Sequence, residues 1–323
     1  MFLTGPPAEP AGTGLRISRT ERRIFDRSSE LATDPSMRPY LSDMVGPYGL
    51  ALRDEVFEAG AGHSYGEMAE PLIGAVVAAR NPAGHPHPSP SPVDLLVVAY
   101  GIHDVRLGRN TATYLSSRCP GNPLAFAVCD QGVAAAFSAL RTIDAYAATG
   151  ACRRALLLVV EQSALHYELA EPARIPDRHA AVALLLETVG DTTNPESQAG
   201  TDPVVVRQRT AVTPDAVGAL LAAELAELPG GGRDATLILG ADLAAGWTGN
   251  AGAYEVVLAP AGQPYTGVWW ELSAGLPAWQ ARGRQVVVAE YDPVLGYLCT
   301  AAMRFGSAPR GQLARALTDR VGS

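Results

Sequence analysis

The chain has 323 residues, of which 47% are hydrophobic and 18% charged, and its formal net charge is −8. This length suits two average domains or one large domain of two similar halves, and the composition fits a well-buried α/β core. The scattered basic residues exclude a nucleic-acid binder, and no apolar run reaches the ~20 residues of a membrane span.

The N-terminal third begins irregularly. Residues 1–40 are rich in Pro, Gly and Arg and predict a strand or two with an irregular loop. They show no signal-peptide pattern, so a cytoplasmic protein is expected. Residues 66–80 predict a helix with small residues that permit close packing. The segment 82–92 is a Pro-rich loop. The apolar run 93–101 is typical of a strand buried on both faces of a sheet.

The middle of the chain contains a strand, a cysteine and a helix in succession. Residues 124–128 predict a short strand that leads directly to Cys129. Residues 133–149 predict a long Ala-rich helix, which Gly150 ends. Two further buried strands are expected at 154–161 and 180–187.

The second half repeats this alternation. Strands are expected at 204–207, 235–240, 285–290 and 297–305, and a helix is expected at 216–228. Strands that alternate with helices predict a layered α/β fold with largely parallel sheets.

The cysteines and histidines indicate neither a disulfide framework nor a metal site. The cysteines at 119, 129, 152 and 299 form no CxxC pair, so they are expected to be free thiols. The one close histidine pair, His85 and His87, lies in the Pro-rich segment and is interpreted as part of a solvated loop.

Cys129 is the leading candidate nucleophile. A thiol at the start of a helix feels the partial positive charge of that helix end and its unpaired backbone N–H groups. Both stabilise a thiolate, and the same N–H groups can hold the oxyanion of an acyl group. The alternative is a small, inert residue between strand and helix.

Four segments, 94–101, 110–114, 125–132 and 150–161, resemble the thiolase superfamily and within it the ketoacyl-acyl-carrier-protein synthase III group. The resemblance implies a thiolase fold, a duplicated αβαβα arrangement with mixed, mostly parallel five-stranded sheets. It implies an N-terminal half at 1–190 that carries Cys129 and a C-terminal half at 200–323.

The resemblance leaves the nucleophile position open between two residues. The spacing from Cys129 to Gly150 is about one helical turn longer than in synthase III, whereas Cys129 to Gly132 matches the Cys-x-x-Gly form of other thiolase-fold enzymes. The alternative alignment places Val133 at the nucleophile position, which would make the protein inactive.

The second half departs from the family pattern. Ala241 and Asp242 follow Gly240 where the catalytic His is expected, and Gln263 stands where the catalytic Asn is expected. The glycine-rich loop before the last strand is replaced by residues 291–297. Decarboxylative condensation is therefore not expected, because these donors stabilise the enolate.

Further site residues are proposed around these positions. Asp242 is a candidate base, against the alternative of a helix-capping residue. His103 and His166 follow strand ends in the first half and are further candidates; the alternative is that each is an ordinary polar side chain on a surface loop. The candidates for lining an acyl pocket are Gln263, Tyr265, Trp269 and Leu295. Trp269 and Trp270 are adjacent and cannot share a face, so at least one should be ordinary packing.

Two functions remain open. The first is an atypical acyltransferase of secondary metabolism, which moves an acyl group from coenzyme A or a carrier protein through Cys129 to an acceptor. The second is a non-catalytic partner subunit of a heterodimeric synthase. No tightly bound cofactor is expected. The resemblance implies a homodimer or a heterodimer with a related chain.

Overall fold

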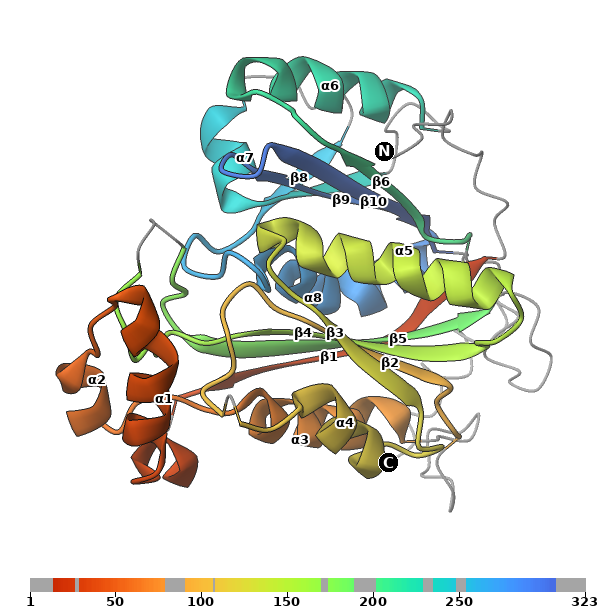
Figure 1. Ribbon diagram of the computed structural model, residues 1–323. Coiled ribbons are helices and arrows are strands. Elements are labelled where there is room, and N and C mark those ends of the chain that lie inside the picture. The colour runs from red at the N-terminus through yellow and green to blue at the C-terminus, as the bar shows by residue number, and fades with distance from the viewer. Residues whose placement is uncertain are drawn as a thin grey trace, which may run out of the picture.

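The computed structural model describes residues 14–26, 29–78, 91–106, 108–169, 174–188, 202–228, 235–247 and 254–305. They form two five-stranded sheets, one above the other in Figure 1. Helices lie between the sheets, and further helices cover the outer face of each sheet (Figure 1). The protein is therefore built of five layers.

The N-terminal sheet has the strand order β1-β5-β4-β2-β3. Its strands are β1 Leu15–Phe25, β2 Leu95–Ala99, β3 Leu124–Val128, β4 Arg154–Glu161 and β5 His179–Thr188. β5 pairs antiparallel with β1 and β4, whereas β4, β2 and β3 are parallel to one another. Four strands thus run in one direction, and β5 runs against them.

The C-terminal sheet repeats this topology in the order β6-β10-β9-β7-β8. Its strands are β6 Val205–Arg209, β7 Ala235–Leu239, β8 Glu255–Leu258, β9 Gln285–Asp292 and β10 Tyr297–Arg304. β10 pairs antiparallel with β6 and β9, and β7 is parallel to both β8 and β9. β4 and β9 therefore occupy equivalent places in the two sheets.

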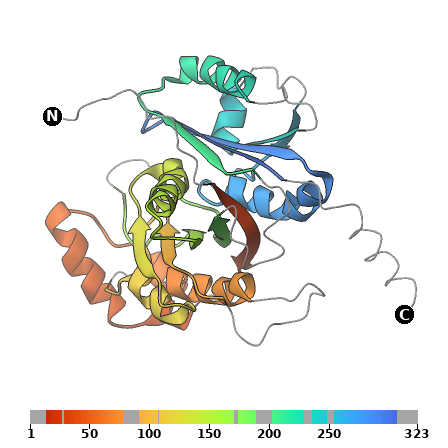
Figure 2. The same ribbon diagram turned by 90° about the vertical axis from the view of Figure 1, so that its right-hand side faces the viewer.

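The helices complete the layers. They are α3 Tyr65–Val77, α4 Thr111–Arg118, α5 Ala135–Ala148, α6 Pro214–Ala226, α7 Ala241–Gly246 and α8 Gly267–Arg282. α5 and α8 share one hydrophobic core with the facing sides of both sheets. α3 and α4 cover the outer face of the N-terminal sheet, and α6 and α7 that of the C-terminal sheet. Figure 2 shows the same order of layers from the side.

Burial on both faces explains the long apolar strands. Seven of the eight residues of β4 are buried, as are all eight of β9. Such strands cannot alternate polar and apolar residues, because neither face meets water. The small residues of α5 let it approach the sheets closely, with Phe137 and Ile143 fully buried on its core side.

A small lobe precedes α3. It contains the 3-10 helices η1 Glu30–Thr33 and η2 Gly46–Tyr48 and the helices α1 Met37–Val45 and α2 Asp54–Glu58. Its own core gathers around Met37, Leu41 and Val105. In Figure 1 the lobe projects beside the N-terminal sheet.

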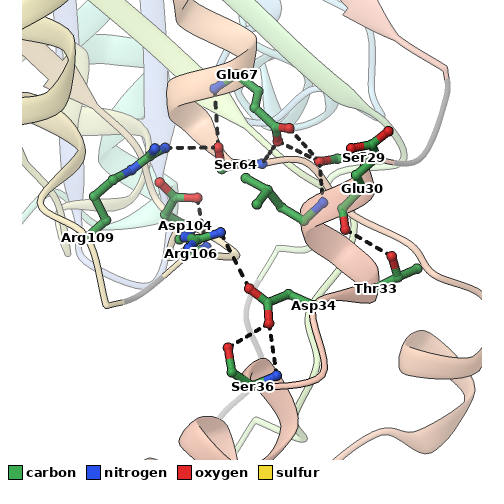
Figure 3. A network of polar contacts seen from close by, with 11 residues as sticks. Ser29, Glu30, Thr33, Asp34, Ser36, Ser64, Glu67, Asp104, Arg106 and Arg109 are labelled. Carbon is green, nitrogen blue, oxygen red and sulfur yellow. Dashed lines mark hydrogen bonds and ion pairs between the residues drawn. The ribbon is translucent and has the colours of Figure 1, made fainter.

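A polar network joins this lobe to α3 and to the loop after β2 (Figure 3). Ser64 and Glu67 form a capping box at the start of α3. The Ser29 hydroxyl donates to the Glu67 carboxylate at 2.6 Å. The buried Asp104 carboxylate accepts from the Tyr65 amide at 3.0 Å. The start of α3 is thus the point at which three segments are fixed.

The structure confirms the predicted fold class and matches most of the predicted elements. β3 and β4 begin and end at the predicted residues. The predicted 133–149 helix is a 3-10 turn followed by α5. The sequence reading did not identify α1, α2, α4, α7, α8 or β8. The predicted boundary between the halves, 190–200, lies outside the described residues. Among the described helices, none is long and apolar enough to cross a membrane.

Candidate functional site

Cys129 stands directly after β3, at the turn that leads toward α5. It is partly exposed, whereas Cys119, Cys152 and Cys299 are buried. The Cys129 Sγ donates to the Asp130 Oδ2 at 3.3 Å, and Asp130 adopts the left-handed backbone conformation with φ 58°.

The pKa of Cys129 differs from the sequence expectation. Burial raises the pKa of the thiol, and the hydrogen bond and negative charge of Asp130 raise it further. A hydrogen bond from Tyr100 acts in the opposite direction without prevailing. The expected lowering by a helix N-terminus was wrong because α5 begins only at Ala135.

Val133, and not Cys129, lies at the start of the central helix. It belongs to the 3-10 turn η3 Gly132–Ala134, which runs directly into α5. The Val133 amide donates to the Asp292 Oδ2 at 3.3 Å. A carboxylate from β9 therefore accepts an N–H group at the start of the central helix.

Asp292 fixes two segments at once. Its Oδ1 accepts from the Val294 and Leu295 amides, both at 3.0 Å, in the turn between β9 and β10. Its Oδ2 would lie 1.9 Å from a Cβ atom placed on Gly132, whose φ is +51°. Only glycine therefore fits at position 132, because the carboxylate and the positive φ both exclude a side chain.

The other central helix is held in the same way from the opposite half. Glu161, the last residue of β4, is fully buried. Its Oε2 accepts from the Tyr265 amide at 2.9 Å and the Thr266 amide at 3.1 Å, just before α8. A strand end in each half thus holds the start of the other half's central helix, and the two contacts are equivalent under the duplication.

The positions of the expected His and Asn are occupied by structural contacts. Asp242 forms an ion pair with Arg174, and Tyr265 Oη donates to the Arg174 carbonyl at 3.0 Å. Gln263 is buried, and its Nε2 donates to the Thr266 Oγ1 at 3.0 Å. The Asp177 amide donates to the Gly262 carbonyl at 2.9 Å. The segment 174–178 therefore lies across the loops that follow β7 and β8.

A third buried carboxyl group, after those of Asp292 and Glu161, lies beside these contacts. Glu290, on β9, is 4% exposed, and its Oε2 would lie 1.8 Å from a Cβ atom on Gly240. Burial raises its pKa to about 8; Arg174 opposes this shift, whereas Asp292 and Glu161 add to it. Burial likewise raises the pKa of Glu161 to about 7, despite its hydrogen bonds to Thr266 and Tyr265.

The two candidate histidines have different surroundings. His166 is buried, packs on Phe57 of α2 at 4.7 Å between ring centroids, and has no hydrogen-bond partner for its Nε2. Burial lowers its pKa. His103 is exposed, and its carbonyl accepts from the Gln162 Nε2 at 2.6 Å. No hydrogen bond or ion pair among the described residues links either histidine to Cys129.

The candidate pocket residues divide between core and turn. Trp269 is fully buried in the core, 5.0 Å from the Phe137 ring, whereas the Arg22 guanidinium stacks on Trp270 at 4.5 Å. The prediction that at least one of the two tryptophans is ordinary packing holds for Trp269. Leu295 lies in the exposed turn held by Asp292.

No group of three or more His, Cys, Asp or Glu residues in the described part of the chain could hold a metal ion. The predicted loop with His85 and His87 lies outside the described residues.

Comparison with known proteins shows which structures share this architecture. No protein-family model and no curated protein matches the chain. Solved structures match over nearly all of it, among them the tetronic acid condensing enzyme AbyA1, with 16% identity, a TM-score of 0.59 and coverage of 90% of this chain and 100% of that one.

Two further structures show the same extent of similarity. The acyltransferase ChlB3 is 15% identical, with a TM-score of 0.54 over 91% of this chain and 98% of its own. The 3-oxoacyl-(acyl carrier protein) synthase III FabH from Pseudomonas aeruginosa PAO1 is 16% identical, with a TM-score of 0.53 over 92% and 100%. The chain therefore has the thiolase fold, as the resemblance in the sequence implied.

The sequence reading singled out Asp242 and Gln263 but missed Glu290, Asp292 and Arg174. The acidic residues at the end of β9 carried a signal that could have found two of them. A carboxylate at the end of a fully buried strand needs a partner, since it cannot be left alone in the interior.

Proposed function

We propose that the chain is the non-condensing subunit of a thiolase-fold dimer that acts on acyl thioesters. One observation carries this proposal: the Asp292 carboxylate accepts the Val133 N–H at the start of α5. An acyl oxyanion would need that N–H group, and a fixed carboxylate there repels negative charge.

The residues around this helix end support the same function. The Val133 side chain has no nucleophilic atom, and the Ala241 side chain has no hydrogen-bond donor. The side-chain amide of Gln263 already donates to Thr266. Asp292 holds the start of α5 in the same way as Glu161 holds the start of α8. The helix that would carry a catalytic site, α5, is therefore fixed like its structural counterpart α8.

β3 supplies the surface for a partner. It is an edge strand that pairs only with β2 in the sheet. All five of its residues are apolar, yet each is partly or fully exposed, and Leu124 is 55% exposed. An apolar edge strand invites pairing with another chain. Thiolase-fold dimers share a continuous sheet, so we expect β3 to pair with the equivalent strand of the partner subunit.

Co-expression with a thiolase-fold chain that has the complete Cys, His and Asn set tests this function. Native mass spectrometry should find a one-to-one heterodimer, and condensation should require both chains. Ala127→Arg on the exposed face of β3 should abolish the heterodimer, whereas Val256→Arg on the edge strand β8 should not. Release of carbon dioxide from malonyl-coenzyme A by the purified chain alone would refute the proposal.

A second candidate, acyl transfer through Cys129, is favoured by the partial exposure of that thiol and by its hydrogen bond from Tyr100. In this function coenzyme A or a carrier protein would deliver the acyl group. A mass increment on the Cys129 peptide after incubation with acyl-coenzyme A, lost in Cys129→Ala, would establish it in place of the partner function.

A further inference from the structure

The turn between β9 and β10 is held firmly, yet it carries two exposed apolar side chains. Asp292 Oδ1 accepts from the amides of Val294 and Leu295, both at 3.0 Å, and the Gly296 amide donates to the Asp292 carbonyl at 2.8 Å. The Gly296 carbonyl in turn accepts from the Val212 amide at 2.9 Å. Despite these contacts, Val294 is 78% exposed and Leu295 is 42% exposed. The turn therefore presents to water, in a fixed position, apolar surface whose burial would be favourable.

The same turn packs against the residues that follow β3. Asp292 Oδ2 accepts from the Val133 amide at 3.3 Å. The Leu295 Cδ1 atom would lie 3.3 Å from a Cβ atom placed on Gly132. The residues between β3 and this contact, 129–132, are all partly or fully exposed. β3, residues 129–132 and the turn residues Val294 and Leu295 thus form one continuous surface, called here the β3–turn surface.

The β3–turn surface is apolar at both ends and carries a single charged residue. Leu124 and Ala127 are exposed on β3, and Val294 and Leu295 are exposed on the turn. The charged residue is Asp130, which is exposed and lies between the two ends in the left-handed conformation, with φ 58°. A partner that covers this surface would therefore need apolar side chains at both ends and a basic side chain near the middle.

The equivalent edge of the C-terminal sheet is less suited to a partner. β8 also exposes apolar side chains, with Val256 at 40% and Leu258 at 61%. Its first residue, Glu255, is charged and makes an ion pair with Arg284 at 2.6 Å. Charged side chains on an edge strand discourage pairing with another chain, whereas β3 has none. β3 is therefore the edge that favours an interface.

We propose that the turn between β9 and β10 is a second contact for the partner subunit that pairs with β3, with Val294 and Leu295 packed into an apolar hollow of that subunit. The occupant is a second thiolase-fold chain. A subunit that pairs along β3 and continues past Val128 meets residues 129–132, and Leu295 lies directly against Gly132. The inference rests on the proposed function and adds to it a contact outside the shared sheet.

This contact would also bear on the start of α5. The turn that the partner covers is the one that Asp292 holds, and the same carboxylate accepts the Val133 N–H. A partner packed on Val294 and Leu295 would keep the turn, and with it the carboxylate, in place. Formation of the dimer and the occupied helix end are thereby linked.

Variants of the full chain test the contact in the heterodimer with the condensing chain used to test the proposed function. Val294→Asp should raise the Kd at least about tenfold, because it would bury an unpaired carboxylate. Val294→Ala should raise the Kd less, by about two- to fivefold, because it only shortens the side chain. Leu258→Asp on β8 is the matched control, since Leu258 is an exposed apolar residue outside the surface, and its Kd should stay within about twofold of wild type. Val294 is 78% exposed, so circular dichroism and thermal unfolding should find its variants folded like the wild-type chain.

Hydrogen–deuterium exchange of the unaltered chain provides a second measurement. Peptides covering 129–135 and 291–297 should gain at least about threefold protection when the heterodimer forms, whereas a peptide covering 254–258 should not. A heterodimer that is lost in Ala127→Arg but binds Val294→Asp as tightly as wild type would overturn the turn contact and leave the proposed function standing. Unchanged exchange at 291–297 in that heterodimer would have the same meaning. If no heterodimer forms, the turn contact and the proposed function both fail.

Discussion

A reactive thiol can be rebuilt at the start of α5, and its behaviour depends on Asp292. Val133→Cys, made in a Cys129→Ala background, places a thiol at a helix N-terminus, which by itself lowers a thiol pKa. The Asp292 carboxylate lies 3.3 Å from the backbone amide of this position and opposes that effect. We expect Val133→Cys alone to be a sluggish nucleophile and Val133→Cys with Asp292→Asn to be a faster one.

The expected difference in nucleophilicity between the two variants follows from the negative charge of Asp292. Two unit charges about 4 Å apart interact by about 4 kcal/mol at an effective dielectric constant of about 20, and partial solvation reduces this. A nearby like charge typically shifts a pKa by about one to three units. Taking about 1.5 units, the thiolate fraction at neutral pH rises about 30-fold on removal of the charge. Because nucleophilicity falls with pKa, with a Brønsted coefficient of about 0.5, the rate gain should be about fivefold.

The rate of iodoacetamide alkylation, followed by peptide mass spectrometry across pH, measures this difference. Asp215→Asn, in the first turn of α6, is the control for removal of one carboxylate. Equal alkylation rates with and without Asp292→Asn would show that the carboxylate does not act on this helix end, and the main support for the non-condensing function would be lost.

Three further predictions concern other parts of the chain. Alkylation of Cys129 should be slow at neutral pH and rise in alkaline solution, because its pKa is raised, and Asp130→Asn should accelerate it; equal rates for the two proteins would contradict this. His179 has a pKa lowered to about 4 by burial and by His63, so the unfolded chain takes up its proton first. Between pH 4 and pH 6.5 the contribution of His179 to the free energy of unfolding should therefore rise by about 2–3 kcal/mol, which appears in urea titrations as the difference between the wild-type protein and His179→Gln; the same pH dependence in both proteins would refute this. Trp269→Ala should cost about 3–5 kcal/mol in the same assay, since the ring is fully buried against Phe137, and a cost below about 1 kcal/mol would contradict its place in the core.

The sequence by itself determined the layered fold and most of its strands. β4 could be located to the residue, because a strand covered on both faces is an unbroken apolar run bounded by polar or turn residues. β3 was also located to the residue, as the apolar run that leads directly to Cys129. α8 was missed because its apolar residues are spread around the helix, with Pro277 inside it, so no single face stands out. The residue types at positions 241 and 263 were enough to argue against decarboxylative condensation.

Only the tertiary structure determined which contacts the residues of the candidate site make. The Val133–Asp292 contact joins residues 159 apart in sequence, and the Glu161–Thr266 contact joins residues 105 apart. No local pattern encodes such pairings, because they arise from the packing of the two halves. The pKa of Cys129 was mispredicted for the same reason. A helix end lowers a thiol pKa only within about its first turn, and the turn at Asp130 both delays α5 and places a carboxylate on the sulfur.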